Sequence, residues 1–228
     1  MTTRDSGPTT PPNTHGRELL TRLAWVAACA VAMALVEAAV VVYLRALHPV
    51  AGPLAVLRTV LPDRIIAVEI TREAATLVML LAVAVLAETS RWRRFLVFSL
   101  MFGVWDICYY AWLRVFVGWP ESLLTWDVLF LIPMPWVGPV LAPVLVSACL
   151  VAGAVWLLAR DIRGLPWYTW ASAVAGGALI LVSFMIDAME ALTAVQPPPY
   201  RWGLFGAGTG LALAGLVAGV RQVRKRTT

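Results

Sequence analysis

The chain of 228 residues has little charge for its length. Asp, Glu, Lys and Arg make up 14% of the residues, whereas 61% are hydrophobic and the mean hydropathy is +0.80. A composition this apolar is outside the range of ordinary soluble domains. Within hydrocarbon only helices or a closed barrel satisfy the backbone, and the apolar runs here lack the alternation of barrel strands. The sequence therefore predicts an all-α integral membrane protein whose main partner is the lipid bilayer.

Lysine, histidine and cysteine are scarce, and each scarcity excludes a class of chemistry. The single lysine, Lys225, lies outside every apolar run, so no retinal Schiff base is expected. Only His48 lies outside the N-terminal segment, and haem usually needs an axial histidine or a methionine pair, so no haem is expected. Cys29, Cys108 and Cys149 fall in apolar windows and predict buried packing residues without disulfides. The short basic C-terminus beside a membrane predicts contact with lipid headgroups, and no nucleic-acid binding.

Six runs of about 20 apolar residues, the length that crosses a bilayer, predict six transmembrane helices. These runs are residues 23–47, 65–87, 95–119, 140–159, 167–189 and 202–220. A further apolar run at 123–132 is too short to cross, and four prolines interrupt residues 133–143. We therefore expect a re-entrant or half-helix element between the third and fourth helices of the bundle.

The distribution of basic residues predicts the orientation. The two terminal segments and the second and fourth loops carry most of the eighteen Arg and Lys residues, as cytoplasmic segments do. Residues 1–22 are expected to form a disordered cytoplasmic tail, 23–220 the bundle and 221–228 a basic cytoplasmic tail. The chain is thus predicted to be a multi-pass protein of the cell's inner or plasma membrane. The glycine-rich last span predicts close helix contact, for which internal packing is favoured over a homo-oligomer interface.

Three carboxylates within the predicted spans lie at nearly the same depth. Counted from the outer ends at about 1.5 Å per residue, Glu37 lies roughly 15 Å deep, Glu73 roughly 12 Å and Asp106 roughly 16 Å. Such residues normally face the bundle interior or a water-filled cavity, because a charge that faces lipid is costly. We therefore expect these three acids to form the inner set of an acidic cavity that opens on the outer side.

Further polar residues are expected around this inner set. The predicted outer group of acids consists of Glu69, Asp127, Asp187 and Glu190. The predicted supporting residues are Arg72, Tyr109, Tyr110 and His48. Asp127 belongs to the Trp- and Pro-rich stretch before the fourth span, which is expected either to cap the cavity or to form an interfacial loop with aromatic anchors.

The excess of acids over intramembrane arginine must be cancelled by protons, water or a bound cation. The leading hypothesis is a carboxylate cluster that binds, and in one version translocates, a cation, a metal or a proton. A divalent metal is one candidate cofactor, although no span holds the histidine that dinuclear bundle sites use. A second hypothesis is a membrane-embedded enzyme in which a carboxylate-bound metal or acid–base carboxylates act on a lipid or quinone-like substrate. The third is a structural or assembly subunit in which Arg72 pairs with Glu69 or Glu73.

Overall fold

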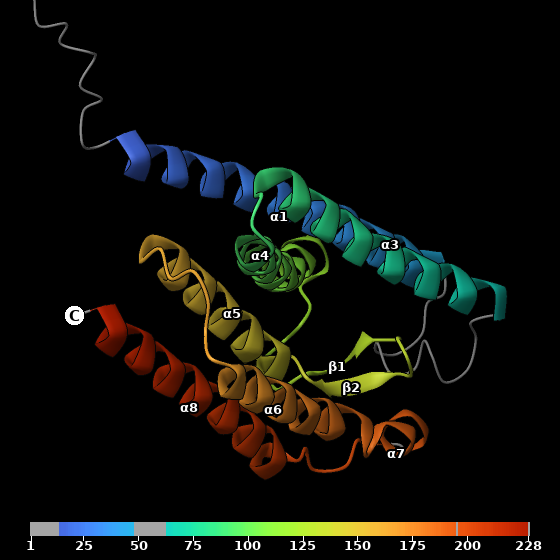
Figure 1. Cartoon of the computed structure of the whole chain (residues 1–228). Coiled ribbons are helices and arrows are strands. Elements are labelled where there is room, and N and C mark those ends of the chain that lie inside the picture. Colours follow the sequence, from blue (N-terminus) through green and yellow to red (C-terminus); the bar gives the residue numbers. More distant parts are fainter. Residues whose placement is uncertain (1–13, 48–62, 195, 228) are drawn as a thin grey trace, which may run out of the picture.

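The computed structural model describes residues 14–47, 63–194 and 196–227. Within them it has six helices that are long and apolar enough to cross a membrane. These are α1 (Thr14–Leu47), α3 (Asp63–Ala87), α4 (Arg91–Val117), α5 (Leu141–Ala159), α6 (Trp167–Met185) and α8 (Trp202–Thr227) (Figure 1). All six predicted spans are confirmed. The chain is therefore a polytopic helical membrane protein.

The segment between α4 and α5 forms a β-hairpin instead of the expected half-helix. Strand β1 (Trp126–Phe130) pairs antiparallel with β2 (Trp136–Pro139), and Asp127 lies opposite Gly138. Aromatic and β-branched residues favour extended backbone. Proline has no backbone N–H to donate, and the hairpin has its prolines in the turn, at Pro133 and Pro135, and at the end of β2, at Pro139. The half-helix prediction is wrong because pairing between two strands satisfies this backbone better than an interrupted helix. The depth of the hairpin in a bilayer stays a prediction.

The predicted tails are helical wherever the structure describes them. Helix α1 begins at Thr14, inside the segment expected to be a disordered tail, and α8 continues to Thr227. Arg22 Nη1 lies 3.0 Å from Glu88 Oε1 in the connection between α3 and α4, so the first turns of α1 are attached to the bundle. Residues 14–22 are therefore helical in the structure, and the division of the chain into tails and bundle stays a prediction.

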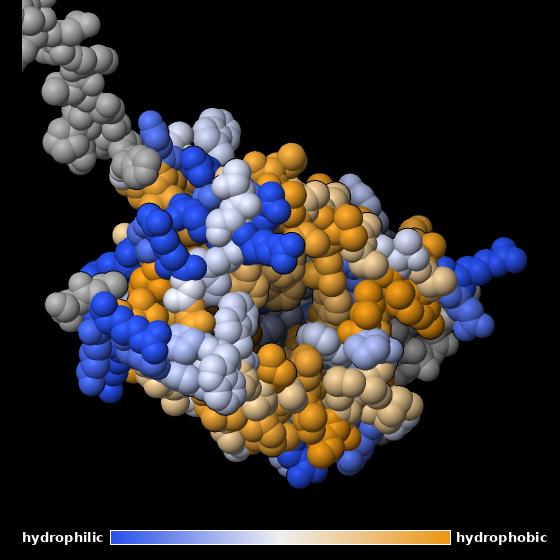
Figure 2. Space-filling view, viewed as in Figure 1, coloured by the Kyte–Doolittle hydropathy of each residue, from blue (hydrophilic) through white to orange (hydrophobic). Residues whose placement is uncertain are grey.

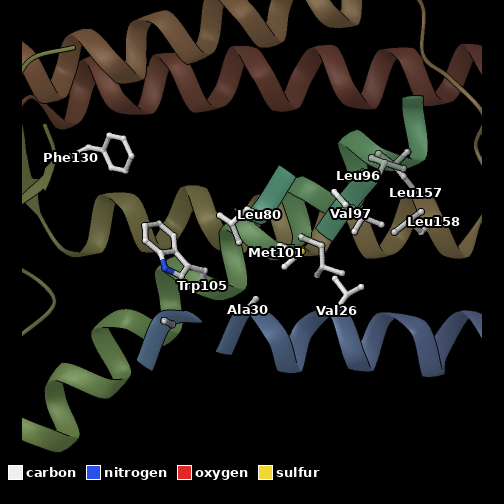
Figure 3. Close-up of a cluster of buried hydrophobic side chains, with 14 of the residues drawn as sticks. Val26, Ala30, Leu80, Leu96, Val97, Met101, Trp105, Phe130, Leu157 and Leu158 are labelled. Atoms are coloured by element: carbon white, nitrogen blue, oxygen red, sulfur yellow. The ribbon is translucent and has the colours of Figure 1, made fainter. Parts of the chain in front are cut away.

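The helices form two groups. Helix α4 packs against α1, α3 and α5, whereas α6 and α8 pack chiefly against each other. The largest described apolar cluster surrounds α4 and includes Val97 and Met101 of α4 together with Val26 and Ala30 of α1 (Figure 3). Helix α4 ends before Gly118, whose left-handed backbone (φ 69°) lets its N–H donate to the Arg114 carbonyl.

The two ends of the bundle differ. Both described chain ends lie at one end, here named the termini end, as an even number of spans requires (Figure 1). The hairpin and the short helix α7 (Ala188–Thr193) lie at the other end, here named the hairpin end. Hydrophilic side chains gather at the termini end, and apolar ones cover much of the visible middle (Figure 2). Which end faces the cytoplasm stays a prediction.

Glycines of the last span serve internal packing. A Cβ at Gly208 would lie 2.6 Å from the carbonyl oxygen of Gly176, so the backbones of α6 and α8 touch there. Gly215 and Gly219 likewise face side chains of α6. The favoured reading of internal packing is thus confirmed for these positions. Other glycines of α8 face open space, namely Gly203, Gly206 and Gly210. A homo-oligomer stays a prediction.

Candidate functional site

An acidic cavity of about 120 Å³ lies at the hairpin end between α1, α3, α4 and β1. It brings together five of the seven predicted acids: Glu37, Glu69, Glu73, Asp106 and Asp127. Its lining also includes the predicted supporting residues Arg72, Tyr109 and Tyr110, together with Arg45. Acids from three different helices therefore share one cavity, as their common depth along the sequence predicts.

Arg72 connects two helices through its ion pairs. Its Nε and Nη2 lie 3.0 Å and 2.6 Å from Glu69 Oε2, one turn earlier on α3, and its Nη1 contacts Glu37 Oε1 on α1. The hydroxyl of Thr76 also donates to Glu37, at 3.3 Å. The i, i+3 and i+4 spacing on α3 places these groups on one helical face. The structural pairing of Arg72 expected with Glu69 is therefore present, and Glu37 adds a link between helices.

The other inner acids have separate hydrogen-bond donors. Glu73 Oε2 accepts the backbone N–H of Leu131 at 2.9 Å, so the hairpin is attached to α3. Asp106 Oδ2 accepts the hydroxyl proton of Ser147 on α5 at 2.8 Å. A Cβ at Gly103 would lie 2.6 Å from the Ser147 carbonyl oxygen. The missing side chain at Gly103 thus lets α5 approach closely enough for this hydrogen bond.

Asp127 closes the cavity from the hairpin side. It is 3% exposed, and the hydroxyl of Tyr110 donates to its Oδ2 at 3.3 Å. Burial raises the pKa of this carboxyl to about 7, which places its titration near neutral pH. The guanidinium of Arg45 lies 4.2 Å from the ring centroid of Trp119 and lines the same cavity. Asp127 therefore lies in a capping position, the first of the two arrangements considered for this stretch.

Three predicted site residues are not found in the cavity. Asp187 forms an ion pair with Arg201, at 2.7 Å between Oδ2 and Nε, and Glu190 is exposed. Both belong to the segment around α7, which packs against β2, whereas the cavity is lined by β1. The prediction that Asp187 and Glu190 lie around the inner acids is therefore wrong, because α6 ends before Asp187 and the chain turns away. His48 lies outside the described residues.

Several partners of the acids have no clear signal in the sequence. Ser147 and the Leu131 amide come from segments remote in sequence, and only the packing of α5 and the hairpin brings them to the carboxylates. Arg45 lies near the end of the first apolar run. Thr76 follows Arg72 by four residues, so the sequence spacing places both on one helical face.

The five carboxylates surround the cavity without converging on one point. Among the residues that the structure describes, no three Asp, Glu, His or Cys side chains form a group that could hold a metal ion. A divalent metal therefore stays a prediction. No protein-family model, curated protein or solved structure matches the chain.

Proposed function

We propose that the chain binds a cation in the acidic cavity, and that this cation is a proton or a small monovalent or organic ion. The observation that carries the proposal is the lining: among the residues that the structure describes, five carboxylates and two guanidinium groups, those of Arg45 and Arg72, face one cavity. Within a low-dielectric bundle such an excess of negative charge is cancelled by protonation or by a bound cation. The cavity is thus suited to positive charge.

The separate partners of the acids favour a proton or a monovalent ion over a divalent metal. A hard divalent cation takes several oxygen ligands at about 2.0–2.6 Å, which requires carboxylates that converge. Here Glu73 and Asp106 each accept a hydrogen bond from a different element. Such carboxylates can gain and lose protons one at a time while the surrounding helices stay in place.

Binding is better supported than translocation. Toward the termini end, the described core around α4 is formed by apolar side chains such as Leu96, Val97 and Leu157. A route for ions would need polar groups or water at this depth. The cavity is therefore proposed as a site that exchanges its cation with the hairpin end.

The ion pairs of Arg72 give specific support to a second, structural function. One guanidinium bridges Glu37 of α1 and Glu69 of α3, two helices that otherwise contact each other little. In this alternative the acids stabilise helix packing and bind no exchangeable cation. Titration of the carboxyl groups separates the two functions.

The test is infrared difference spectroscopy of the purified chain between about pH 5 and about pH 8, a range that lies above the pKa of an ordinary exposed carboxyl. The wild type is expected to show a protonated carboxyl band that Glu73→Gln and Asp106→Asn each reduce. The control is Glu121→Gln, which removes an exposed acid near the hairpin. A band that is absent in the wild type, or unchanged in both variants, would contradict the proposal. Reconstituted vesicles with a pH-sensitive dye test translocation separately, and no flux is expected.

A further inference from the structure

An apolar groove runs along α4, between α5 and the α6–α8 pair. Its part nearer the termini end has a volume of about 270 Å³. Its lining is contributed by four helices, with Trp92 and Phe95 from α4, Leu150 from α5, Trp170 and Gly177 from α6, and Leu213 from α8. Phe95, Trp170 and Leu213 are exposed by 43%, 40% and 41%, so the groove opens sideways, toward the surrounding lipid.

A middle cavity lies between the groove and the acidic cavity. This middle cavity, of about 280 Å³, shares Val146, Gly177 and Ile180 with the groove. The same middle cavity shares Trp105 and Asp106 with the acidic cavity. The visible face of the molecule is hollowed near its centre, beside α4, α5 and the hairpin (Figure 2). The groove, the middle cavity and the acidic cavity therefore adjoin one another between the lipid-facing surface and the carboxylates.

The combined length of the groove and the middle cavity corresponds to a long hydrocarbon chain. From Trp92 to Asp106 they cover about 21 Å along α4 at 1.5 Å per residue. This is more than half of the roughly 30 Å hydrocarbon thickness of a bilayer. A lipid with one hydrocarbon tail could enter the groove sideways from the bilayer. Its tail would then lie among apolar side chains, and its head group would reach Asp106.

The place where the middle cavity meets the acidic cavity has features that favour an ammonium head group. Aromatic rings surround it, with 5.4 Å between the centroids of Phe130 and Trp136 and 6.3 Å between those of Trp136 and Phe184. Aromatic faces attract ammonium groups, and the carboxylates beyond them add opposite charge. A neutral or anionic head group would leave the excess negative charge of the cavity uncancelled.

Trp105 adds a separate requirement at the same place. It is 6% exposed and lines both the middle and the acidic cavity, yet its indole N–H has no acceptor among the described residues. A buried donor without a partner costs free energy unless a ligand or water supplies an acceptor. An oxygen beside the ammonium group of a ligand would meet this requirement.

We propose that the groove and the acidic cavity together bind a single-chain lipid with an amino-alcohol head group. Its hydrocarbon tail lies along α4, and its ammonium group reaches Asp106. Its hydroxyl oxygen accepts a hydrogen bond from the indole N–H of Trp105. The head-group part of this inference rests on the proposed cation site, whereas the tail part rests on the groove alone.

The experiment measures binding of radiolabelled 2-amino-1-hexadecanol to the full chain in maltoside micelles, with empty micelles as the blank. Hexadecylamine lacks the hydroxyl, hexadecanol lacks the ammonium, and ethanolamine lacks the tail. The amino alcohol is expected to bind at least about tenfold more tightly than hexadecanol, which lacks the hydrogen bond to a charged group, and than ethanolamine, which lacks the buried methylenes. It is expected to bind about tenfold more tightly than hexadecylamine, which leaves the buried indole N–H without an acceptor. Equal binding of hexadecanol would overturn the ammonium assignment.

Three variants test where each part of the ligand binds. Asp106→Asn should weaken both amine ligands by about tenfold or more and leave hexadecanol unchanged. Trp105→Phe keeps an aromatic ring but removes the donor, so it should abolish the preference for the amino alcohol over hexadecylamine. Gly177→Leu should obstruct the groove without a clash, because a Cβ there meets nothing within 4 Å. Its matched control is Gly206→Leu, an equally open glycine on α8 that does not line the groove.

The outcomes distinguish this inference from the proposed function. Gly177→Leu is expected to weaken the amino alcohol by about tenfold, the effect of excluding about two methylenes, while the infrared titration of the carboxyls stays unchanged. If Gly177→Leu binds the ligand as Gly206→Leu does, the groove is not the tail site. A wild type whose carboxyls titrate but which binds no amino alcohol overturns this inference alone. A wild type that shows neither overturns the cation site as well.

Discussion

The ion pairs of Arg72 give the sharpest test of how the acidic cavity is held together. Replacement of Arg72 by Gln removes the cation that joins Glu37 and Glu69 but keeps a side chain of similar length. Glu37 and Glu69 have side chains that are only about 10% exposed, so each would be left as a buried carboxylate without its main partner. The variant should therefore be less stable than the wild type.

The expected loss follows from burial. Removal of one partner from a buried ion pair costs about 3–5 kcal/mol. The Arg72 side chain is 21% exposed, so part of its charge is solvated, and a loss just below this range, about 2–3 kcal/mol, is expected. The assay is unfolding by a denaturing detergent in mixed micelles, followed by tryptophan fluorescence, which yields the free energy of unfolding.

Two further variants test whether the loss of stability comes from the broken ion pairs. Arg64→Gln removes an exposed arginine from the same helix and should change stability by less than about 0.5 kcal/mol. The triple variant Glu37→Gln, Glu69→Gln, Arg72→Gln removes both stranded charges and should recover most of the loss. The reasoning is refuted if Arg72→Gln costs no more than Arg64→Gln, or if the triple variant is no more stable than Arg72→Gln alone.

Three other predictions concern the hairpin and the helix contacts. Burial raises the pKa of Asp127 from 3.8 to about 7, so between these pH values the folded wild type holds more protons than the unfolded chain. The wild type therefore loses stability as pH rises through this range, by up to about 1.4 kcal/mol per pH unit. In Asp127→Asn this pH dependence of the free energy of unfolding should flatten. Unfolding measured from pH 4 to pH 8 checks this, and an unchanged slope would contradict it. Gly103→Val should destabilise by about 1–3 kcal/mol, because its Cβ would overlap the Ser147 carbonyl; a thermal unfolding midpoint equal to that of the wild type would contradict the close α4–α5 contact. Gly208→Val should separate α6 from α8 and lower the midpoint, whereas Gly210→Val, which faces open space, should lower it far less.

The helices and the shared cavity could be predicted because both follow from local properties of the chain. The length and hydropathy of an apolar run determine whether it spans a bilayer, and the predicted run 140–159 differs by one residue from α5, Leu141–Ala159. The constant rise of a helix places Glu37, Glu73 and Asp106 at one depth before any packing is known. The structure then places all three in one cavity.

The hairpin and the position of Asp187 could not be predicted in the same way. A short apolar run such as 123–132 is compatible with a strand or a helix, and periodicity alone does not separate the two. Only the pairing of β1 with β2 decides for the strand. Asp187 lies near the outer end of the fifth predicted span, on the same side as the cavity, but the chain turns at the end of α6 and Asp187 pairs with Arg201.

The sequence by itself determined that this chain is a six-helix membrane protein with its buried acids toward one end, because hydrophobic length and helical rise are properties of each segment alone. The tertiary structure decided which acids meet, which donors hold them and that an apolar groove extends toward them. Those features depend on contacts between segments remote in sequence: the close approach at Gly103 that brings Ser147 to Asp106, and the space left where α6 and α8 pack on each other and stand apart from α4 and α5.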